Sequence, residues 1–156
     1  MFHIVLYEPE IPANTGNIIR LCANAGAQLH LIKPLGFDLD DKKLRRAGLD
    51  YHEWVNVQEY GSLAGFIADI KPERLFALTT KGKRKVSDVR FQAQDAFLFG
   101  PETRGLPVAI LEDLGGDSCL YLPMRDESRS LNLSNTVSIV LYEAWRQLSF
   151  AGALIK

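Results

Sequence analysis

Several signatures of common enzyme chemistry are missing from this 156-residue sequence. No GxGxxG follows the first apolar run and no GxxxxGK[ST] occurs, which argues against the usual dinucleotide and phosphate-binding fingerprints. No serine lies in a GxSxG stretch, so a hydrolase triad has little support. The three histidines, His3, His30 and His52, show no metal-ligand spacing. We therefore expect neither a metal site nor a hydrolytic triad.

The sequence also has little net charge, few cysteines and no long apolar run. The formal charge is -1, which argues against a protein coated in positive charge, although a local basic patch could still hold a polyanion. Cys22 falls in a predicted helix and Cys119 in a predicted strand, which favours two buried thiols in a reduced compartment over a disulfide. No run approaches the 18 apolar residues of a membrane span and no basic leader precedes one. We expect a soluble, cytoplasmic protein with no membrane partner.

What the sequence does contain is an alternation of short apolar runs with helical patterns. A length of 156 residues, 47% of them hydrophobic, predicts a single domain over residues 1–156. The predicted strands are Phe2–Tyr7, Gln28–Ile32, Leu75–Thr79, Ala96–Phe99 and Cys119–Leu122. The predicted helices between them are Thr15–Asn24, Gly61–Ile70 and Pro107–Leu114. This order predicts an α/β fold with a mainly parallel sheet covered on both faces.

The last helix pattern begins in an unusually polar segment, SRSLNLSN. Its apolar residues recur at helical spacing and predict one buried face: Leu133, Val137, Val140, Leu141, Ala144 and Trp145. The helix should start near Asn132 to Ser134. The small polar side chains before it could simply cap the helix, or they could bind polar groups of a ligand. Composition alone leaves these two interpretations about equally supported.

Two further stretches combine a strand end with polar or flexible residues. In AFLFGPETRGLP, Gly100 and Gly105 would let a ligand approach the end of a buried strand, but a tight turn before a helix explains them as well. In EPEIPANTGNIIR, Asn14 or Thr15 could cap a helix that carries Arg20. Arg20 is then either an ordinary solvated residue or a phosphate-binding fork.

Together the stretches NTGNIIR, FLFGPETRGLP and SLNLSNTVSIVLYEAWRQ, in this order, resemble the three motifs of the SPOUT superfamily of RNA ribose methyltransferases. The short chain and its opening EPEIPANTGNIIR are most similar to the members that modify the wobble nucleotide of tRNA. The resemblance implies an α/β-knot fold with a C-terminal trefoil knot, against the general rule that chains are unknotted. It also implies S-adenosylmethionine as cofactor, 2′-O-methylation of the wobble cytidine or uridine, and leucine tRNA as substrate.

The same resemblance assigns roles to individual residues. Those implied to bind the cofactor are Leu78, Gly100, Glu102, Leu122, Met124, Ser130 and Leu131. Those implied in catalysis are Arg20, Ser130 and Asn132, and those implied in RNA binding are Asn14, Arg20 and Tyr142. Since an arginine side chain stays protonated, we interpret Arg20 as a group that binds the nucleotide's phosphate and stabilises a developing alkoxide, with Ser130 and Asn132 orienting the hydroxyl. We expect a homodimer, which would bring Arg20 of one subunit near the other subunit's cofactor.

Two basic runs could contact RNA, or could be solvated faces. They are Lys42, Lys43, Arg45 and Arg46, and then Lys81, Lys83, Arg84, Lys85 and Arg90. Two other functions remain open. One is a related enzyme that acts on ribosomal RNA or another tRNA position, and the other is an RNA-binding protein without catalysis. A nicotinamide-binding domain is a distant third, because the glycine fingerprint is missing.

Overall fold

The computed structural model describes residues 1–40, 42–45, 51–54 and 56–156, and of residues 43, 45, 51 and 52 only the backbone. Seven strands form one sheet in the order β3-β2-β1-β6-β4-β7-β5, and every pairing between them is parallel. The strands are β1 (His3–Tyr7), β2 (Gln28–Ile32), β3 (Val57–Tyr60), β4 (Leu75–Leu78), β5 (Arg84–Lys85), β6 (Ala96–Phe99) and β7 (Cys119–Tyr121). The parallel α/β architecture predicted from the apolar runs is confirmed.

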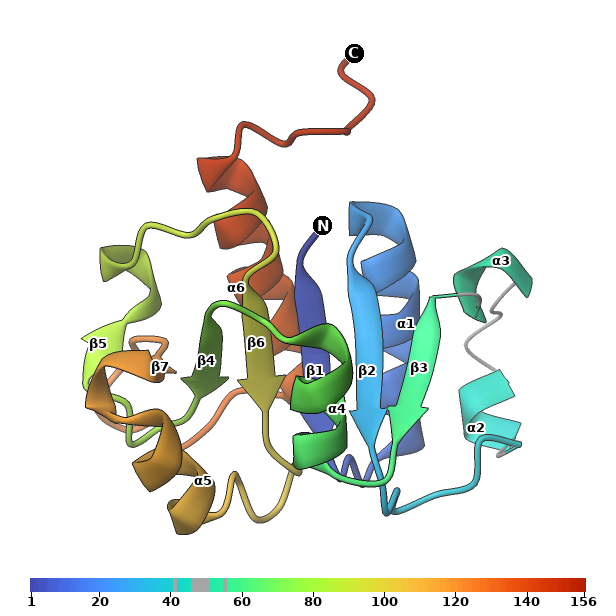
Figure 1. Ribbon diagram of the computed structural model, residues 1–156, viewed down its shortest axis with the longest axis horizontal. Coiled ribbons are helices and arrows are strands. Elements are labelled where there is room, and N and C mark those ends of the chain that lie inside the picture. The colour runs from blue at the N-terminus through green and yellow to red at the C-terminus, as the bar shows by residue number, and fades with distance from the viewer. Residues whose placement is uncertain (41, 46–50, 55) are drawn as a thin grey trace.

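Helices cover both faces of the sheet (Figure 1). They are α1 (Pro12–Ala25), α2 (Lys42–Arg45), α3 (Tyr51–Trp54), α4 (Leu63–Ile70), α5 (Val108–Leu114) and α6 (Leu133–Gln147), with 3₁₀ turns at η1 (Val86–Asp88) and η2 (Gly116–Ser118). Helices α1 and α6 pack on one face, where Ile18 and Val140 join a large apolar cluster. Helices α4 and α5 pack on the other face, where Phe66 joins a smaller one. Because both faces are covered, the central strands are apolar on both sides.

The helix ends follow local chemistry. Helix α1 ends at Gly26, whose left-handed backbone (φ 71°) lets its N–H donate to the carbonyl of Cys22. Helix α4 ends before Pro72 at Lys71, which is also left-handed (φ 51°). Helix α6 begins at Leu133, and the side chain of Asn132 accepts hydrogen bonds from the N–H groups of Ser134 and Asn135. The predicted start of this helix is confirmed, and Asn132 caps it.

Two predicted helix starts are wrong. Helix α4 begins at Leu63, two residues after the expected Gly61, and Ser62 caps it. Helix α1 begins at Pro12, three residues before the expected Thr15, with Ile11 at the cap position and no side-chain cap. Asn14 and Thr15 therefore lie inside the first turn and cap nothing. Proline suits this position because its fixed φ is helical and it has no N–H to leave unpaired.

Two strands at opposite edges of the sheet were not predicted. Strand β3 reads VQEY and β5 is only the pair Arg84–Lys85. Each has a neighbour on one side only, so polar side chains can face solvent there and no apolar run marks the strand. Within the described residues, no helix is long and apolar enough to cross a membrane. The C-terminal trefoil knot stays a prediction.

Candidate active site

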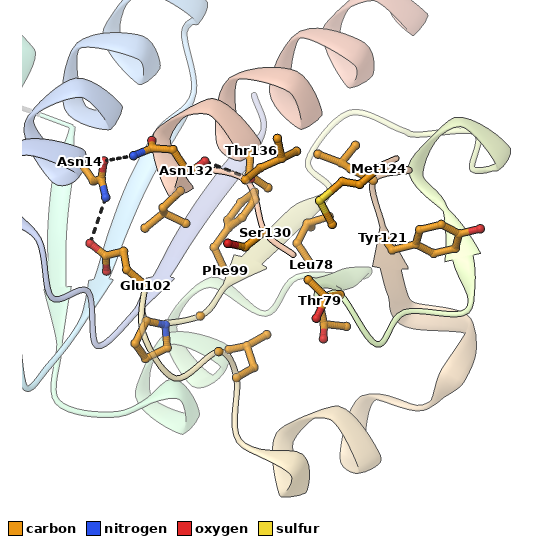
Figure 2. Close-up of a pocket in the computed structure, with 18 of the residues that line it drawn as sticks. Asn14, Leu78, Thr79, Phe99, Glu102, Tyr121, Met124, Ser130, Asn132 and Thr136 are labelled. Carbon is orange, nitrogen blue, oxygen red and sulfur yellow. Dashed lines mark hydrogen bonds between the residues drawn. The ribbon is translucent and has the colours of Figure 1, made fainter. Parts of the chain in front are cut away.

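A cavity of about 350 Å³ opens at the carboxyl ends of β4, β6 and β7 and at the start of α6 (Figure 2). Ligands of parallel α/β sheets commonly bind at this edge. The lining residues are Ile11, Asn14, Leu78, Thr79, Thr80, Phe99, Gly100, Pro101, Glu102, Gly105, Leu106, Tyr121, Leu122, Met124, Ser130, Leu131, Asn132, Leu133 and Thr136. Segments far apart in the sequence therefore meet around one space.

The three motif stretches supply most of this lining. All seven residues that the sequence resemblance implied in cofactor binding line the cavity: Leu78, Gly100, Glu102, Leu122, Met124, Ser130 and Leu131. Asn14 and Asn132 line it too. Arg20 and Tyr142 are not among the lining residues.

The wall is largely apolar, with hydroxyl groups at intervals. Leu78 and Phe99 are buried at the ends of β4 and β6, and Met124 lies across from them after β7. The hydroxyls of Thr79 and Ser130 add polar groups to the wall. An apolar cavity with a few placed polar groups is typical of a small-molecule site, and its volume falls within the usual range of about 300–1,000 Å³.

Gly100 is required by the loop that follows β6. A Cβ atom at this position would lie 2.5 Å from the backbone N of Leu106 and 2.6 Å from the carbonyl carbon of Gly105. The loop turns back on itself because Gly105 adopts φ +67° and its N–H donates to the carbonyl of Pro101 at 2.9 Å. A side chain at position 100 would therefore collide with the loop itself before it reached a ligand.

The carboxylate of Glu102 ties this loop to the start of α1. It accepts hydrogen bonds from the backbone N–H of Glu10 at 2.8 Å, from that of Ile11 at 2.7 Å and from the Asn14 side chain at 3.3 Å. Glu102 thus satisfies N–H groups at the entry to a helix that has no side-chain cap of its own. Its position on the cavity wall is as expected, and its oxygens are directed at these donors.

Asn14 and Asn132 continue this connection to the start of α6 (Figure 2). The Asn132 amide donates to the Asn14 side-chain oxygen at 3.1 Å, while its own oxygen accepts from the N–H and hydroxyl of Ser134 at 2.9 and 2.7 Å. We call the series Glu102, Asn14 and Asn132 the polar bridge. It links the loop after β6, helix α1 and helix α6, so one residue from each motif stretch contributes to it.

A second set of contacts joins the loop after β6 to the loop before α1. The carboxylate of Glu10 accepts from the backbone N–H of Thr103 at 2.9 Å and from its hydroxyl at 2.8 Å. These bonds stabilise the charged form and lower the pKa of Glu10, the backbone bond most of all. Arg104 lies 4.0 Å from Glu8 and 3.8 Å from Glu10. The two loops therefore hold each other on the side of the cavity next to α1.

Arg20 lies on α1 and pairs with Glu53 of α3. Its Nε lies 3.4 Å from a carboxylate oxygen of Glu53; the Arg20 side chain is 46% exposed, whereas that of Glu53 is 9% exposed. On α6, Tyr142 is 43% exposed and its ring lies edge-on to Trp145, with the centroids 5.5 Å apart. Arg146, one turn further on, pairs with Glu143 at 2.9 Å. Both Arg20 and Tyr142 are thus on exposed helix surfaces outside the cavity.

The predicted basic runs are described in part. Lys81, Lys83 and Lys85 are exposed on and before the edge strand β5, directly after the cavity residue Thr80. Arg84 donates to the carbonyl of Asp117 at 2.9 Å. In the other run Lys42 is exposed, the side chains of Lys43 and Arg45 are outside the described part, and Arg46 is outside it altogether.

The histidines and cysteines that the structure describes are structural. His3 Nδ1 lies 3.0 Å from His30 Nε2 in the buried interior, and burial lowers the pKa of His30 to about 4. Cys22 and Cys119 are both buried and free, as expected, and burial raises the pKa of the Cys22 thiol to about 12. No group of three or more metal-binding side chains occurs among the described residues. The side chain of His52 lies outside them.

Sequence reasoning missed several residues of the site. Thr79, Thr80 and Tyr121 line the cavity beside predicted residues, and their places directly after or at the end of strands could have indicated them. Glu53 carried no such signal, because the sequence does not predict helix α3 or its position beside α1. Only the fold shows that pair.

Comparison with known proteins identifies the family. The model of the SpoU rRNA Methylase family matches residues 1–142. A tRNA (cytidine(34)-2′-O)-methyltransferase from Yersinia pestis is 60% identical, over 100% of this chain and 99% of the relative. A solved structure that concerns 2′-OH methylation of C/U34 on tRNA is 45% identical with a TM-score of 0.89, covering 96% of this chain and 97% of that one.

A more distant structure contains a bound cofactor. The SpoU methyltransferase AviRb from Streptomyces viridochromogenes, in complex with AdoMet, is 26% identical with a TM-score of 0.80, and the match covers 97% of this chain and 58% of that one. The resemblance of the three motif stretches, the parallel fold and these matches all agree. The chain belongs to the SpoU rRNA methylase family.

Proposed function

We propose that the protein methylates the ribose 2′-hydroxyl of the wobble nucleotide, position 34, of tRNA, with S-adenosylmethionine as methyl donor. The observation that carries this proposal is the cavity at the carboxyl edge of the sheet, where all three motif stretches meet. The names of relatives 56–60% identical over nearly the full chain point to the same reaction and the same nucleotide. Leucine tRNA is the expected isoacceptor, by resemblance alone.

The cavity suits a nucleoside-containing cofactor. Leu78, Leu122 and Leu131 offer apolar contacts for an adenine ring, and backbone groups at the strand ends can read its edges. Gly100 lets the loop after β6 fold tightly enough to leave this space. When bound, the cofactor supplies an electrophilic methyl group on a positively charged sulfur. The carboxylate of Glu102 serves by holding the loop to α1.

The ribose would be oriented at the start of α6. Ser130 places a hydroxyl in the wall of the cavity, where it can hydrogen-bond the target 2′-hydroxyl. The amide of Asn132 bonds both Asn14 and the first turn of α6, so it acts by holding this segment in place. The chemistry needs the 2′-oxygen in line with the methyl group, and positioning of this kind supplies much of an enzyme's acceleration.

The remaining catalytic group would come from a second copy of the chain. Arg20 is half exposed and does not line the cavity of its own chain. In a homodimer it would bind the phosphate of the target nucleotide and stabilise negative charge on the 2′-oxygen at the partner's site. Tyr142 and Ile139, both exposed on α6, offer apolar area for such an interface.

The RNA itself would contact basic residues next to the cavity. Lys81, Lys83 and Lys85 extend from the cavity residue Thr80 along the edge of the sheet. Contact with several phosphates would make binding sensitive to salt. We further propose that residues 1–156 act as one cytoplasmic, knotted domain that needs no metal.

The experiment that tests this function incubates the protein with labelled S-adenosylmethionine and with either total tRNA or ribosomal RNA, each from a strain that lacks the endogenous activity. We expect label in tRNA, and mass spectrometry should place the methyl group on the ribose of nucleotide 34. Chelator should not change the rate. Label in ribosomal RNA alone, or at another tRNA position, would replace this substrate with a different one. No label in any RNA would contradict catalysis.

A further inference from the structure

Glu53 is an acidic side chain that is almost fully buried, although it lies on a very short helix. Helix α3 has only four residues, yet the Glu53 carboxylate is 9% exposed and lies against α1. Withdrawing a carboxylate from water costs free energy unless a positive or hydrogen-bonding group compensates it. The Nε of Arg20, 3.4 Å away, provides such a group.

Stability is a weak reason for this pair. The Arg20 side chain is 46% exposed, and solvent around it weakens the attraction between the two charges. The geometry of the contact explains the pair better than its stability does. A guanidinium is planar, so a contact at Nε, the nitrogen nearest the chain, restricts the directions in which its two terminal nitrogens can point.

We propose that Glu53 is a positioning residue that sets the direction of the Arg20 guanidinium for RNA binding and methyl transfer. This inference rests on the function proposed for Arg20 above. Arg20 is a long and flexible side chain, and holding it in one orientation before the RNA binds removes an entropy cost from the reaction. Glu53 touches neither the cavity nor the cofactor site.

The test compares three substitutions at position 53 that differ in reach and charge. Glu53→Gln keeps an oxygen at the same distance but removes the charge. Glu53→Asp keeps the charge but is one methylene too short for Nε at its present distance. Glu53→Ala removes both. Glu73→Ala, which removes an exposed carboxylate before β4, is the matched control.

If Glu53 acts by positioning Arg20, kcat should depend on whether the side chain at position 53 is long enough to contact Arg20 Nε. We expect kcat to fall on the order of tenfold to a hundredfold in Glu53→Asp and Glu53→Ala and within about threefold in Glu53→Gln. The affinity for S-adenosylmethionine and the melting temperature of Glu53→Asp should stay near wild type. In an Arg20→Ala background the same substitutions should cause no further loss.

Three results would overturn the proposal. They are wild-type kcat in Glu53→Asp, an equal loss in all three variants, or the same loss with and without Arg20. If Glu53→Ala does not fold, the comparison of kcat between Glu53→Asp and Glu53→Gln still tests the proposal.

A direct measurement separates this inference from the function on which it rests. The Arg20 Nε–H signal in ¹H–¹⁵N NMR spectra, assigned by its loss in Arg20→Ala, should be protected from exchange in the wild type and in Glu53→Gln. It should lose protection in Glu53→Asp. An inactive wild type with this pattern would contradict the proposed function while leaving the contact intact. An active wild type whose signal is the same in Glu53→Asp would contradict the role of Glu53.

Discussion

The cavity wall and the outer surface of α1 present their polar groups in different ways. Around the cavity, the side chains of Glu102, Asn14 and Asn132 are joined to one another and to backbone N–H groups, so their positions follow from the fold of one chain. On α1, Arg20 faces outward and contacts Glu53. The side proposed to bind the cofactor is thus assembled within one chain, whereas Arg20, on the side proposed to bind RNA, lies outside the cavity.

The strongest way to break the cavity side is to disturb the loop after β6. We expect Gly100→Val to abolish cofactor binding and methyl transfer, because its Cβ would lie 2.5 Å from the backbone of Leu106 and force residues 100–106 to move. Calorimetry with S-adenosylhomocysteine measures the effect. Gly61→Val is the control, because a Cβ there meets no atom within 4 Å. Unchanged affinity in a folded Gly100→Val protein would exclude this loop from the site.

A substitution on the outer surface of α1 should lower methyl transfer without affecting cofactor binding. Arg20→Ala should lower methyl transfer by about 10²–10³ while cofactor affinity stays unchanged, since Arg20 lies outside the cavity. Arg20→Lys should recover little, because a point charge does not reproduce the planar fork. Single-turnover rates at saturating tRNA measure the loss, and Lys156→Ala is a control for the removal of one exposed charge. A rate equal to wild type would exclude Arg20 from the chemistry.

The same comparison shows what the sequence could and could not predict. The buried strands were predictable because apolar runs such as those of β1 and β6 are covered on both faces. The edge strand β3 was not, since half of its residues face water. Periodicity alone would have placed Leu78 in the core, and the family motifs indicated its place on the cavity wall.

Contacts between distant residues explain the rest. Helix α1 starts earlier than predicted, and the group that accepts the N–H bonds at its entry is Glu102, more than 90 residues away. Local capping rules cannot detect a partner that only the fold supplies. The pairing of Arg20 with Glu53, on a short helix that the sequence did not predict, has the same cause. The sequence therefore predicted which motifs line the cavity better than it predicted the partners of their polar groups.

A smaller effect should come from Tyr142, which tests whether a second copy completes the RNA side. In sedimentation, the wild type should have about twice the 17.5 kDa chain mass at micromolar concentration. Tyr142→Ala should weaken dimerisation about fivefold or more, because the exposed ring is a residue type that contributes strongly to interfaces. Tyr142→Phe keeps the ring and its contact with Trp145, so it is the matched control. A fully active monomer at assay concentration would contradict the shared site.

The smallest effect concerns His30, in the sheet beneath both regions. Its titration should change the free energy of unfolding in acid and leave catalysis near neutral pH unchanged. Burial lowers the pKa of His30 to about 4, so this side chain stays neutral in the folded protein at pH values where the unfolded chain takes up a proton, near 6.5. The unfolded state therefore binds more protons between pH 6.5 and 4, and the free energy of unfolding should fall as the pH is lowered through this window, by on the order of 1 kcal/mol per pH unit. Urea unfolding at pH 7.5, 6 and 5 measures the slope. His30→Gln lacks the titrating group and should give a shallower curve, although the loss of the contact with His3 lowers its stability at every pH. Parallel curves for the two proteins would show that acid acts on other groups.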